Sequence, residues 1–231
     1  MDFEDTAEEA EFRAEASAWL KENAEPKSAD HTLAVRRGDP TIVPKAREWM
    51  AKKFEGGFAG IWMRKEYGGR GGTRLQQIIF NQEEGKFAIP PGIFNISHGM
   101  AVPTLMTYAT EAQKQELIPA TLKGDEIWCQ LFSEPGAGSD LAGLRTRAER
   151  DGEDWVINGQ KIWTSGAHYA DRAILVTRSD PNVPKHKGLT YFFLDMKTPG
   201  IEVRPIRQIS GYSGFNEVFL TDVRIPDSQR L

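Results

Sequence analysis

The pattern of hydrophobic and polar positions changes near the middle of the chain. In the first half, apolar residues recur three or four positions apart, as on one face of a helix. After Gly124 they form short runs of extended character, separated by turn residues. The predicted helices are residues 7–23, a second one that contains Ala46 and ends at Gly56-Gly57, then 75–87, 93–108 and one that starts after 110. The predicted strands are residues 127–132, 145–149, 155–157, 160–164, 172–178, 189–196, 201–206 and 217–223.

Local signals set some of these boundaries. Thr6 with Glu9, and Thr110 with Gln113, have the spacing of a capping box, in which side chains satisfy the free amides at a helix start. Pro119 is expected to disturb or end the helix that follows Thr110, because proline lacks the N–H group that a helix interior needs. Residues 26–44 are polar and broken, which indicates a loop.

Asn-Gly is a strong turn signal, so Asn158-Gly159 is expected to separate two strands of a hairpin. Helices first and strands second predict an α+β chain. We expect a helical domain over residues 1–124 and a β domain over residues 125–231, built as a small barrel or sandwich.

The stretch Trp128–Asp140, WCQLFSEPGAGSD, carries the first candidate chemistry. Its apolar start predicts a buried strand, and Gly136 and Gly138 then permit positive φ angles in a turn. Such a loop exposes backbone N–H groups and hydroxyls, which can hold an anionic or ring-shaped cofactor. An ordinary strand-to-loop turn is the alternative.

The segment 158–171, NGQKIWTSGAHYAD, carries the second. On a strand, Trp163 and Ser165 share one face and Thr164 points the other way. An indole beside a hydroxyl can flank a flat aromatic ring and hydrogen-bond its edge. The alternative is a tryptophan packed in the core beside a satisfied serine.

Together these stretches resemble the middle domain of the acyl-CoA dehydrogenase flavoproteins. The matching strings are FSEPGAGSDLAGLRTRAER at 132–150, NGQKIWTSGA at 158–167 and NEVFLTDVRIP at 216–226. The helical region before them has the size of that family's N-terminal domain. The resemblance therefore covers two of the family's three usual domains.

The resemblance implies FAD as cofactor and an acyl-CoA thioester as substrate, from which two hydrogens are removed at the α and β carbons. By position, Trp163 matches the tryptophan that flanks the flavin ring, and Ser165 a hydroxyl residue beside the reactive flavin nitrogen. Ser139 matches a serine near the cofactor pyrophosphate and the bound thioester. The implied cofactor-binding residues are Gln130, Phe132, Ser133, Gly138, Ser139, Trp163, Thr164 and Ser165.

Glu134 is the one carboxylate inside the central motif before Asp140, but the matching glutamate of the family belongs to the turn. The family's catalytic glutamate lies in the C-terminal helical domain, so we expect no catalytic base in this sequence and little activity from this chain alone. The resemblance also implies an electron-transfer flavoprotein as electron acceptor, an oligomer at full length, and fatty acid or steroid degradation as the context.

Composition excludes several other classes. A net charge of −4 gives no electrostatic footprint for nucleic acid, and the basic pair Arg36-Arg37 is expected to be solvated surface. One cysteine, Cys129, favours a reducing cytoplasmic location, and no apolar run approaches the roughly 20 residues that span a membrane. The four histidines show no metal-ligand spacing. The glycines at 68–72 lack the Walker spacing, so a connecting loop is preferred over a phosphate loop.

Two other functions stay open at this point. A shortened, non-catalytic relative would act as a binding subunit for another chain. A flavin monooxygenase of the same fold would turn over an aromatic substrate with oxygen, although the SEPGAGSD and WTS strings favour the dehydrogenase branch.

Overall fold

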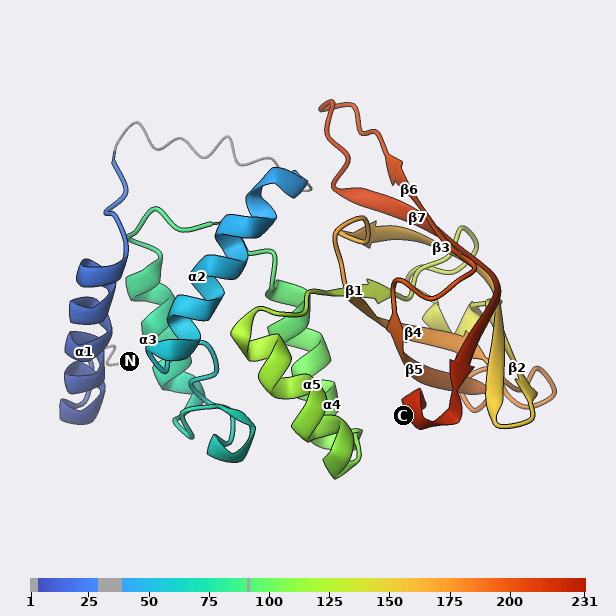
Figure 1. Cartoon of the computed structure of the whole chain (residues 1–231), viewed down its shortest axis with the longest axis horizontal. Helices are drawn as coiled ribbons and strands as arrows, with labels where there is room; N and C mark the ends of the chain where they lie inside the picture. The colour runs from blue at the N-terminus through green and yellow to red at the C-terminus, as the bar shows by residue number, and fades with distance from the viewer. Residues whose placement is uncertain (1–3, 29–38, 91) are drawn as a thin grey trace. The chain divides into compact units, whose positions relative to one another are not determined.

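The computed structural model describes residues 4–28, 39–90 and 92–231, which form two compact units (Figure 1). The pair Arg36-Arg37 and most of the predicted loop 26–44 lie outside the described residues. The first unit contains the helices α1 (Ala7–Asn23), α2 (Val43–Glu55), α3 (Arg74–Glu84) and α5 (Glu111–Lys123). The second contains α4 (Val102–Tyr108) and the strands β1 (Trp128–Leu131), β2 (Arg147–Asp151), β3 (Asp154–Ser165), β4 (Arg172–Arg178), β5 (Leu189–Asp195), β6 (Ile201–Ile206) and β7 (Phe215–Pro226).

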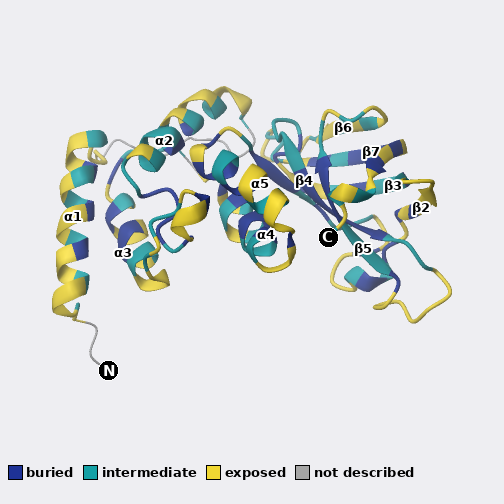
Figure 2. Ribbon diagram, turned by 60° about the horizontal axis from the view of Figure 1, so that its bottom comes forward, coloured by how far each residue is buried: buried dark blue, intermediate teal, exposed yellow. Residues whose placement is uncertain are grey.

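The helical unit is held together by one apolar face of α1. Phe12, Ala16 and Leu20, spaced four residues apart, are buried against Ile79 and Phe80 of α3. Each large side chain buried in this way contributes roughly 1.5–3 kcal/mol relative to an exposed one. In Figure 2 the opposite face of α1 is exposed, as the amphipathic pattern predicts.

The two predicted capping boxes are confirmed. The Thr6 hydroxyl accepts from the Glu9 N–H at 3.3 Å, and the Glu9 carboxylate accepts from the Thr6 N–H at 2.8 Å. Thr110 and Gln113 form the same reciprocal pair at the start of α5.

Pro119, which was expected to disturb or end this last helix, does not end it. Helix α5 continues to Lys123 and ends at Gly124, whose φ of 85° suits a glycine. Ile118 and Leu122 are both fully buried, so packing on either side of the proline stabilises a helix that lacks one internal hydrogen bond.

The strands form one curled seven-stranded sheet in the order β1-β4-β2-β3-β7-β6, with β5 pairing with β4. Its core lies on β3, β4, β5 and β7, where Ile157, Leu175, Phe192 and Val218 are fully buried. The predicted order of a helical region followed by a curled β domain is thereby confirmed. Strands β4 and β6 have the predicted bounds, whereas β7 is longer than predicted at both ends.

The predicted hairpin turn at Asn158-Gly159 is wrong, because β3 runs straight through it from Asp154 to Ser165. The Asn158 amide instead donates to the Asp222 carboxylate and accepts from the Asp222 N–H, both at 3.0 Å. Gly159 is needed for space rather than for a turn. A Cβ atom there would lie 2.7 Å from the Thr146 Cα atom and 2.4 Å from its hydroxyl oxygen.

The turn that opens β3 lies earlier, at Asp151-Gly152. Asp151 pairs with Asp154 across it, and Gly152 has a φ of 65°. The two central residues of this turn are Gly152 and Glu153, and glycine at the first central position is what a type II′ hairpin requires.

The unit that contains the sheet also includes α4 and the π-helical turn Ser97–Ala101 before it. The Ser97 hydroxyl accepts from the Trp128 N–H at 3.0 Å, which ties this turn to the first strand. The domain boundary proposed between residues 124 and 125 stays a prediction. None of the described helices is both long and apolar enough to cross a bilayer.

Replacing Gly159 by alanine is expected to destabilise the sheet, because the new methyl group would meet the Thr146 backbone. Overpacking of this kind costs about 1–3 kcal/mol. Gly99→Ala is the matched control, because a Cβ atom at Gly99 meets nothing within 4 Å. Urea unfolding should show a lower free energy for Gly159→Ala alone, and equal values for the two variants would contradict the packing role of Gly159.

Candidate functional site

Strand β4 is met by two strands along the same edge. Strand β1 pairs with it in parallel, from Trp128 opposite Arg172 to Leu131 opposite Leu175. Strand β2 meets it again at Arg147 opposite Arg178. Residues 132–146 therefore leave β4 and return to it three residues further on. This excursion, which we call the 132–146 loop, contains the SEPGAGSD motif.

Lys161 of β3 closes the gap that the 132–146 loop leaves in the sheet. Its Nζ atom donates to the Val176 carbonyl at 2.8 Å, the Phe132 carbonyl at 3.1 Å and the Glu134 carboxylate at 2.9 Å. The side chain is fully buried. One ammonium group thus supplies donors to β4 and to the first residues of the loop.

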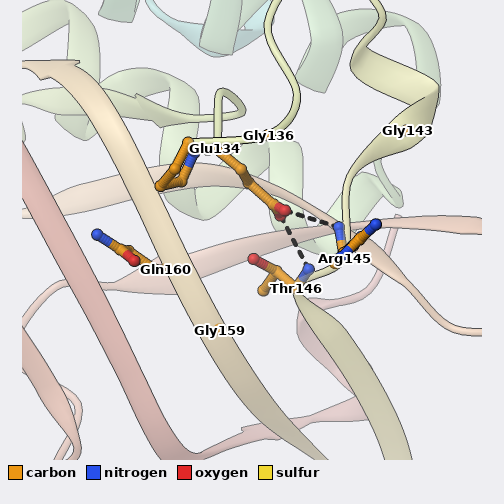
Figure 3. Close-up of a pocket in the computed structure, with 8 residues that line it drawn as sticks. Glu134, Gly136, Gly143, Arg145, Thr146, Gly159 and Gln160 are labelled. Atoms are coloured by element: carbon orange, nitrogen blue, oxygen red, sulfur yellow. Dashed lines mark hydrogen bonds between the residues drawn. The ribbon is translucent and has the colours of Figure 1, made fainter.

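Glu134 ties the start of the loop to its end. Besides Lys161, its carboxylate accepts from the backbone N–H of Arg145 at 2.6 Å and of Thr146 at 2.9 Å, as Figure 3 shows. Only 8% of the Glu134 side chain is exposed. The loop is therefore closed by a buried carboxylate that is saturated with donors.

The two ionised groups depend on each other. Burial raises the pKa of Glu134, but the Lys161 charge and the N–H donors outweigh it and hold that pKa below its usual value. Burial lowers the pKa of Lys161, and the Glu134 charge opposes this. The three acceptors around Nζ need three N–H groups, which only the protonated amine provides, so the geometry requires the ionised pair.

Glu134 also begins a tight turn. The Glu134 and Ala137 backbones exchange two hydrogen bonds of 2.8 and 3.1 Å. The prediction that Gly136 and Gly138 supply positive φ angles is wrong, because neither residue lies in the left-handed region. A Cβ atom at either glycine would meet nothing within 4 Å. The fold of this chain therefore does not itself require glycine at 136 or 138.

The end of the turn carries unused hydrogen-bond donors. Gly138 and Ser139 are exposed, and within the part of the chain that the structure describes their backbone N–H groups donate no hydrogen bond. The glycines at 68–72 differ: Gly71 and Gly72 donate to the carbonyls of Met63 and Ile61, both at 2.7 Å. This supports a connecting loop there rather than a phosphate loop, whereas the amides of Gly138 and Ser139 stay unused.

Strand β3 brings the second predicted stretch beside the first. The Ile162 N–H donates to the Ser133 carbonyl at 2.9 Å, so Trp163 follows directly after the residue that touches the loop. Trp163 is 57% exposed and Thr164 only 1%, and Ser165 is exposed. The predicted alternation of the three side chains is therefore observed.

Trp163 has an unusual backbone. Its φ of 60° is left-handed, and the strand register shifts by one residue between Lys161 and Thr164, which marks a β-bulge. A bulky residue in this region costs about 1–3 kcal/mol, which other contacts must offset. The exposed indole meets the Phe215 ring edge-on, with 6.0 Å between centroids.

The remaining predicted residues lie deeper. Gln130 is half-buried in β1, where it pairs with Ile174. The Phe132 ring packs edge-on against Tyr191, with 6.0 Å between centroids. The Thr164 hydroxyl is buried and makes no hydrogen bond within the described chain. Of the eight predicted residues, the structure thus brings Ser133 next to the strand that carries Trp163 and Ser165, and gives Gly138 and Ser139 free amides.

A cavity of about 380 Å³ lies on the 132–146 loop and β3, with none of the predicted residues among its lining. It is lined by Glu134, Pro135, Gly136, Gly143, Arg145, Thr146, Gly159 and Gln160 (Figure 3). We place the candidate site on the exposed residues Gly138, Ser139, Trp163 and Ser165 instead. Their unused N–H groups, indole and hydroxyl can contact a ligand directly.

Comparison with known proteins identifies the family. The model of the acyl-CoA dehydrogenase N-terminal domain matches residues 6–125, and that of the acyl-CoA dehydrogenase middle domain matches residues 129–223. This chain belongs to the acyl-CoA dehydrogenase family. Acyl-CoA dehydrogenase FadE34 of Mycobacterium tuberculosis is 50% identical over 195 residues, covering 84% of this chain and 27% of FadE34. Acyl-CoA dehydrogenase IpdE1 of the same organism is 36% identical, covering 93% and 56%.

Solved acyl-CoA dehydrogenase structures share the fold over the whole chain. The Tcur3481-Tcur3483 steroid ACAD has a TM-score of 0.83 and 35% identity, and the chain covers 58% of its length. The ChsE4-ChsE5 complex from Mycobacterium tuberculosis has a TM-score of 0.82 and 32% identity, with 57% covered. A glutaryl-CoA dehydrogenase from Mycobacterium smegmatis in complex with FADH2 has a TM-score of 0.72 and 26% identity, with 55% covered. The chain thus spans between a quarter and three fifths of these relatives.

Sequence reasoning missed Lys161 as the residue that holds this acyl-CoA dehydrogenase loop. The signal was present, since alternation along β3 places Lys161 on the same face as the buried Ile157. A lysine on a buried strand face needs acceptors, and a carboxylate at position 134 was the natural candidate.

Removing one member of the buried pair is expected to cost far more than removing a surface pair. Lys161→Met leaves the Glu134 carboxylate buried without its ammonium group, a loss of about 3–5 kcal/mol in unfolding free energy. Lys185→Met is the control, because Lys185 pairs with Asp140 at 2.7 Å but both side chains are more than half exposed; we expect about 0–1 kcal/mol. Equal losses in urea unfolding would contradict the structural role of Lys161.

The contribution of Glu134 is expected to disappear in acid. Its folded pKa lies below the unfolded value of about 4.3, so the stabilisation is present above that pH and is lost as pH falls through the folded pKa. The difference in unfolding free energy between wild type and Glu134→Gln should shrink between pH 7 and about pH 3. A difference that is constant over this range would show that the stabilisation by Glu134 does not depend on the charge of its carboxylate.

Proposed function

We propose that this protein binds FAD and takes part in the α,β-dehydrogenation of an acyl-CoA thioester. The observation that carries the proposal is the 132–146 loop: it is anchored by a buried ion pair, yet presents unused N–H groups at Gly138 and Ser139 with open space around Gly136 and Gly138. A loop that is firmly held but leaves donors and space unused is suited to contacts with a ligand.

The residues present fit a flavin nucleotide. The free amides at 138–139 suit a pyrophosphate, since successive N–H groups bind anions. The exposed indole of Trp163 suits a flat ring, and the exposed Ser165 adds a hydroxyl on the same side of β3. The FADH2 in the glutaryl-CoA dehydrogenase relative supports the same cofactor here.

FAD, when bound, accepts the hydride that leaves the β carbon of the thioester. The chain's own residues bind and orient: Ser133, Gly138 and Ser139 on the loop, and Trp163 and Ser165 on β3. We assign Ser139 a second role, toward the thioester, because its side chain is exposed beside the free amides.

Glu134 is not suited to be the general base. Three donors already occupy its carboxylate, it is almost fully buried, and its lowered pKa makes it a weak proton acceptor. We propose that the base is a glutamate of the family's C-terminal domain, which agrees with the greater length of FadE34 and IpdE1.

The substrate and the partners form part of the same proposal. The similarity to a steroid ACAD at 35% identity supports an acyl-CoA with a bulky, steroid-derived acyl group ahead of a straight fatty chain. The ChsE4-ChsE5 complex supports assembly with a second, different chain. We propose an electron-transfer flavoprotein as electron acceptor, and the cytoplasm as location, since Cys129 is a buried free thiol.

The purified protein is expected to show the visible flavin absorption band after addition of FAD. Gly138→Val should weaken FAD binding at least about tenfold while unfolding stays unchanged, because the new side chain fills space that only a ligand would use. Gly99→Ala, which also projects into open space, should bind FAD normally.

The substrate is then tested with steroid-derived and straight-chain acyl-CoAs on the flavin-loaded protein. A shift of the flavin band that needs less of the steroid-derived thioester than of the straight-chain one would support the substrate class, because binding, unlike reduction of the flavin, needs no catalytic base. A wild-type protein that takes up no FAD would overturn the proposed function.

A further inference from the structure

The left-handed backbone of Trp163 raises the question of what holds it. Between the pairs Lys161–Val218 and Thr164–Asn216, β3 has one residue more than β7. The residue that follows the extra one must therefore be fixed by a side chain or by another backbone group, or the strand would slip to a regular ladder.

Asn216 supplies that fixation. It is fully buried on β7, directly opposite Thr164, and its Nδ2 atom donates to the Thr164 carbonyl at 2.9 Å. A carbonyl oxygen can only accept, so the amide orientation is determined: Nδ2 faces Thr164, and Oδ1 faces away from it.

His168 occupies the other side of that amide. Its Nδ1 atom lies 3.1 Å from the Asn216 Oδ1 atom. Since Oδ1 accepts, Nδ1 carries the proton and donates. The histidine thus fixes the amide that fixes the bulge.

The chain returns to this place through a tight turn. Gly166 has a φ of 67°, and its carbonyl accepts from the Tyr169 N–H at 3.1 Å. A Cβ atom at Gly166 would lie 2.5 Å from the Tyr169 hydroxyl oxygen. This turn brings His168 back over the end of the strand whose bulge it supports.

We propose that His168 and Asn216 are positioning residues that set the Trp163 indole and the Ser165 hydroxyl for the ring of the cofactor. The inference rests on the proposed function, since Trp163 and Ser165 are its ring-facing residues. Neither His168 nor Asn216 needs to touch the cofactor; they act through the carbonyl between Trp163 and Ser165. A purely structural role would stabilise the sheet equally well whatever stands at position 163.

The test is a double-mutant cycle on FAD affinity in the intact protein. Asn216→Asp keeps the volume and the acceptor toward His168 but removes the donor to Thr164. His168→Phe removes the donor to Asn216 and is the milder change, because His168 is only partly buried. His186→Phe, in the exposed loop 181–187, is the matched control.

Each of the two changes should weaken FAD binding about tenfold in the wild-type background, within the range measured for directly coupled residues. In a Trp163→Ala background each should weaken it less than about threefold, because the residue they position is gone. The same factor in both backgrounds would overturn the positioning role. If Asn216→Asp fails to fold, His168→Phe decides alone.

A second readout needs no cofactor. Acrylamide quenches the fluorescence of exposed tryptophans. The part that comes from Trp163 is obtained by subtracting the fluorescence of the matching Trp163→Phe protein. His168→Phe should change this quenching, and His186→Phe should not. A wild-type protein that binds no FAD would contradict the proposed function. Unchanged quenching of Trp163 fluorescence in His168→Phe would contradict the positioning role alone.

Discussion

The buried contact between Lys161 and Glu134 is the interaction on which the site depends. A lysine and a glutamate on their own would each be costly to bury. Here the ammonium group meets three acceptors and the carboxylate three donors, so both charges are compensated by geometry. Lys161 also satisfies the carbonyls of Phe132 and Val176 at the place where the 132–146 loop leaves β4. Exposed donors at Gly138 and Ser139 exist because the loop behind them is closed.

The two halves of the candidate site are held by different devices. A charge pair closes the loop that carries Ser139, whereas a neutral chain of hydrogen bonds from His168 through Asn216 supports the bulge that carries Trp163. Low pH therefore weakens the charge pair that closes the loop, because it protonates Glu134. The second device involves no ion pair among these residues, only a hydrogen bond from the imidazole to the Asn216 amide and one from that amide to the Thr164 carbonyl.

Much of the fold could be predicted from the sequence, because helical periodicity and capping boxes are local. The limits of α1, β4 and β6 are examples. Two of the misjudged positions share a cause, since contacts in the folded chain rather than local sequence decided them. Pro119 is tolerated because buried neighbours stabilise the helix around it, and Asn158-Gly159 stays within β3 because Asn158 is bonded to Asp222 of β7. The exposed motif residues were found from spacing and resemblance. Spacing and resemblance did not reveal the roles of Lys161, His168 and Asn216, because these roles depend on pairings between strands that lie far apart in the sequence.

The return of the 132–146 loop to the strand it left has a mechanical consequence. Both its ends are fixed to β4 only three positions apart, at Leu175 and Arg178. A displacement inside the loop is therefore borne by the loop alone and does not shift the register of any strand. The first residues of the loop are also bonded to Lys161 and Ile162 of β3, so a change of length that leaves β3 undisturbed is confined to residues 138–144.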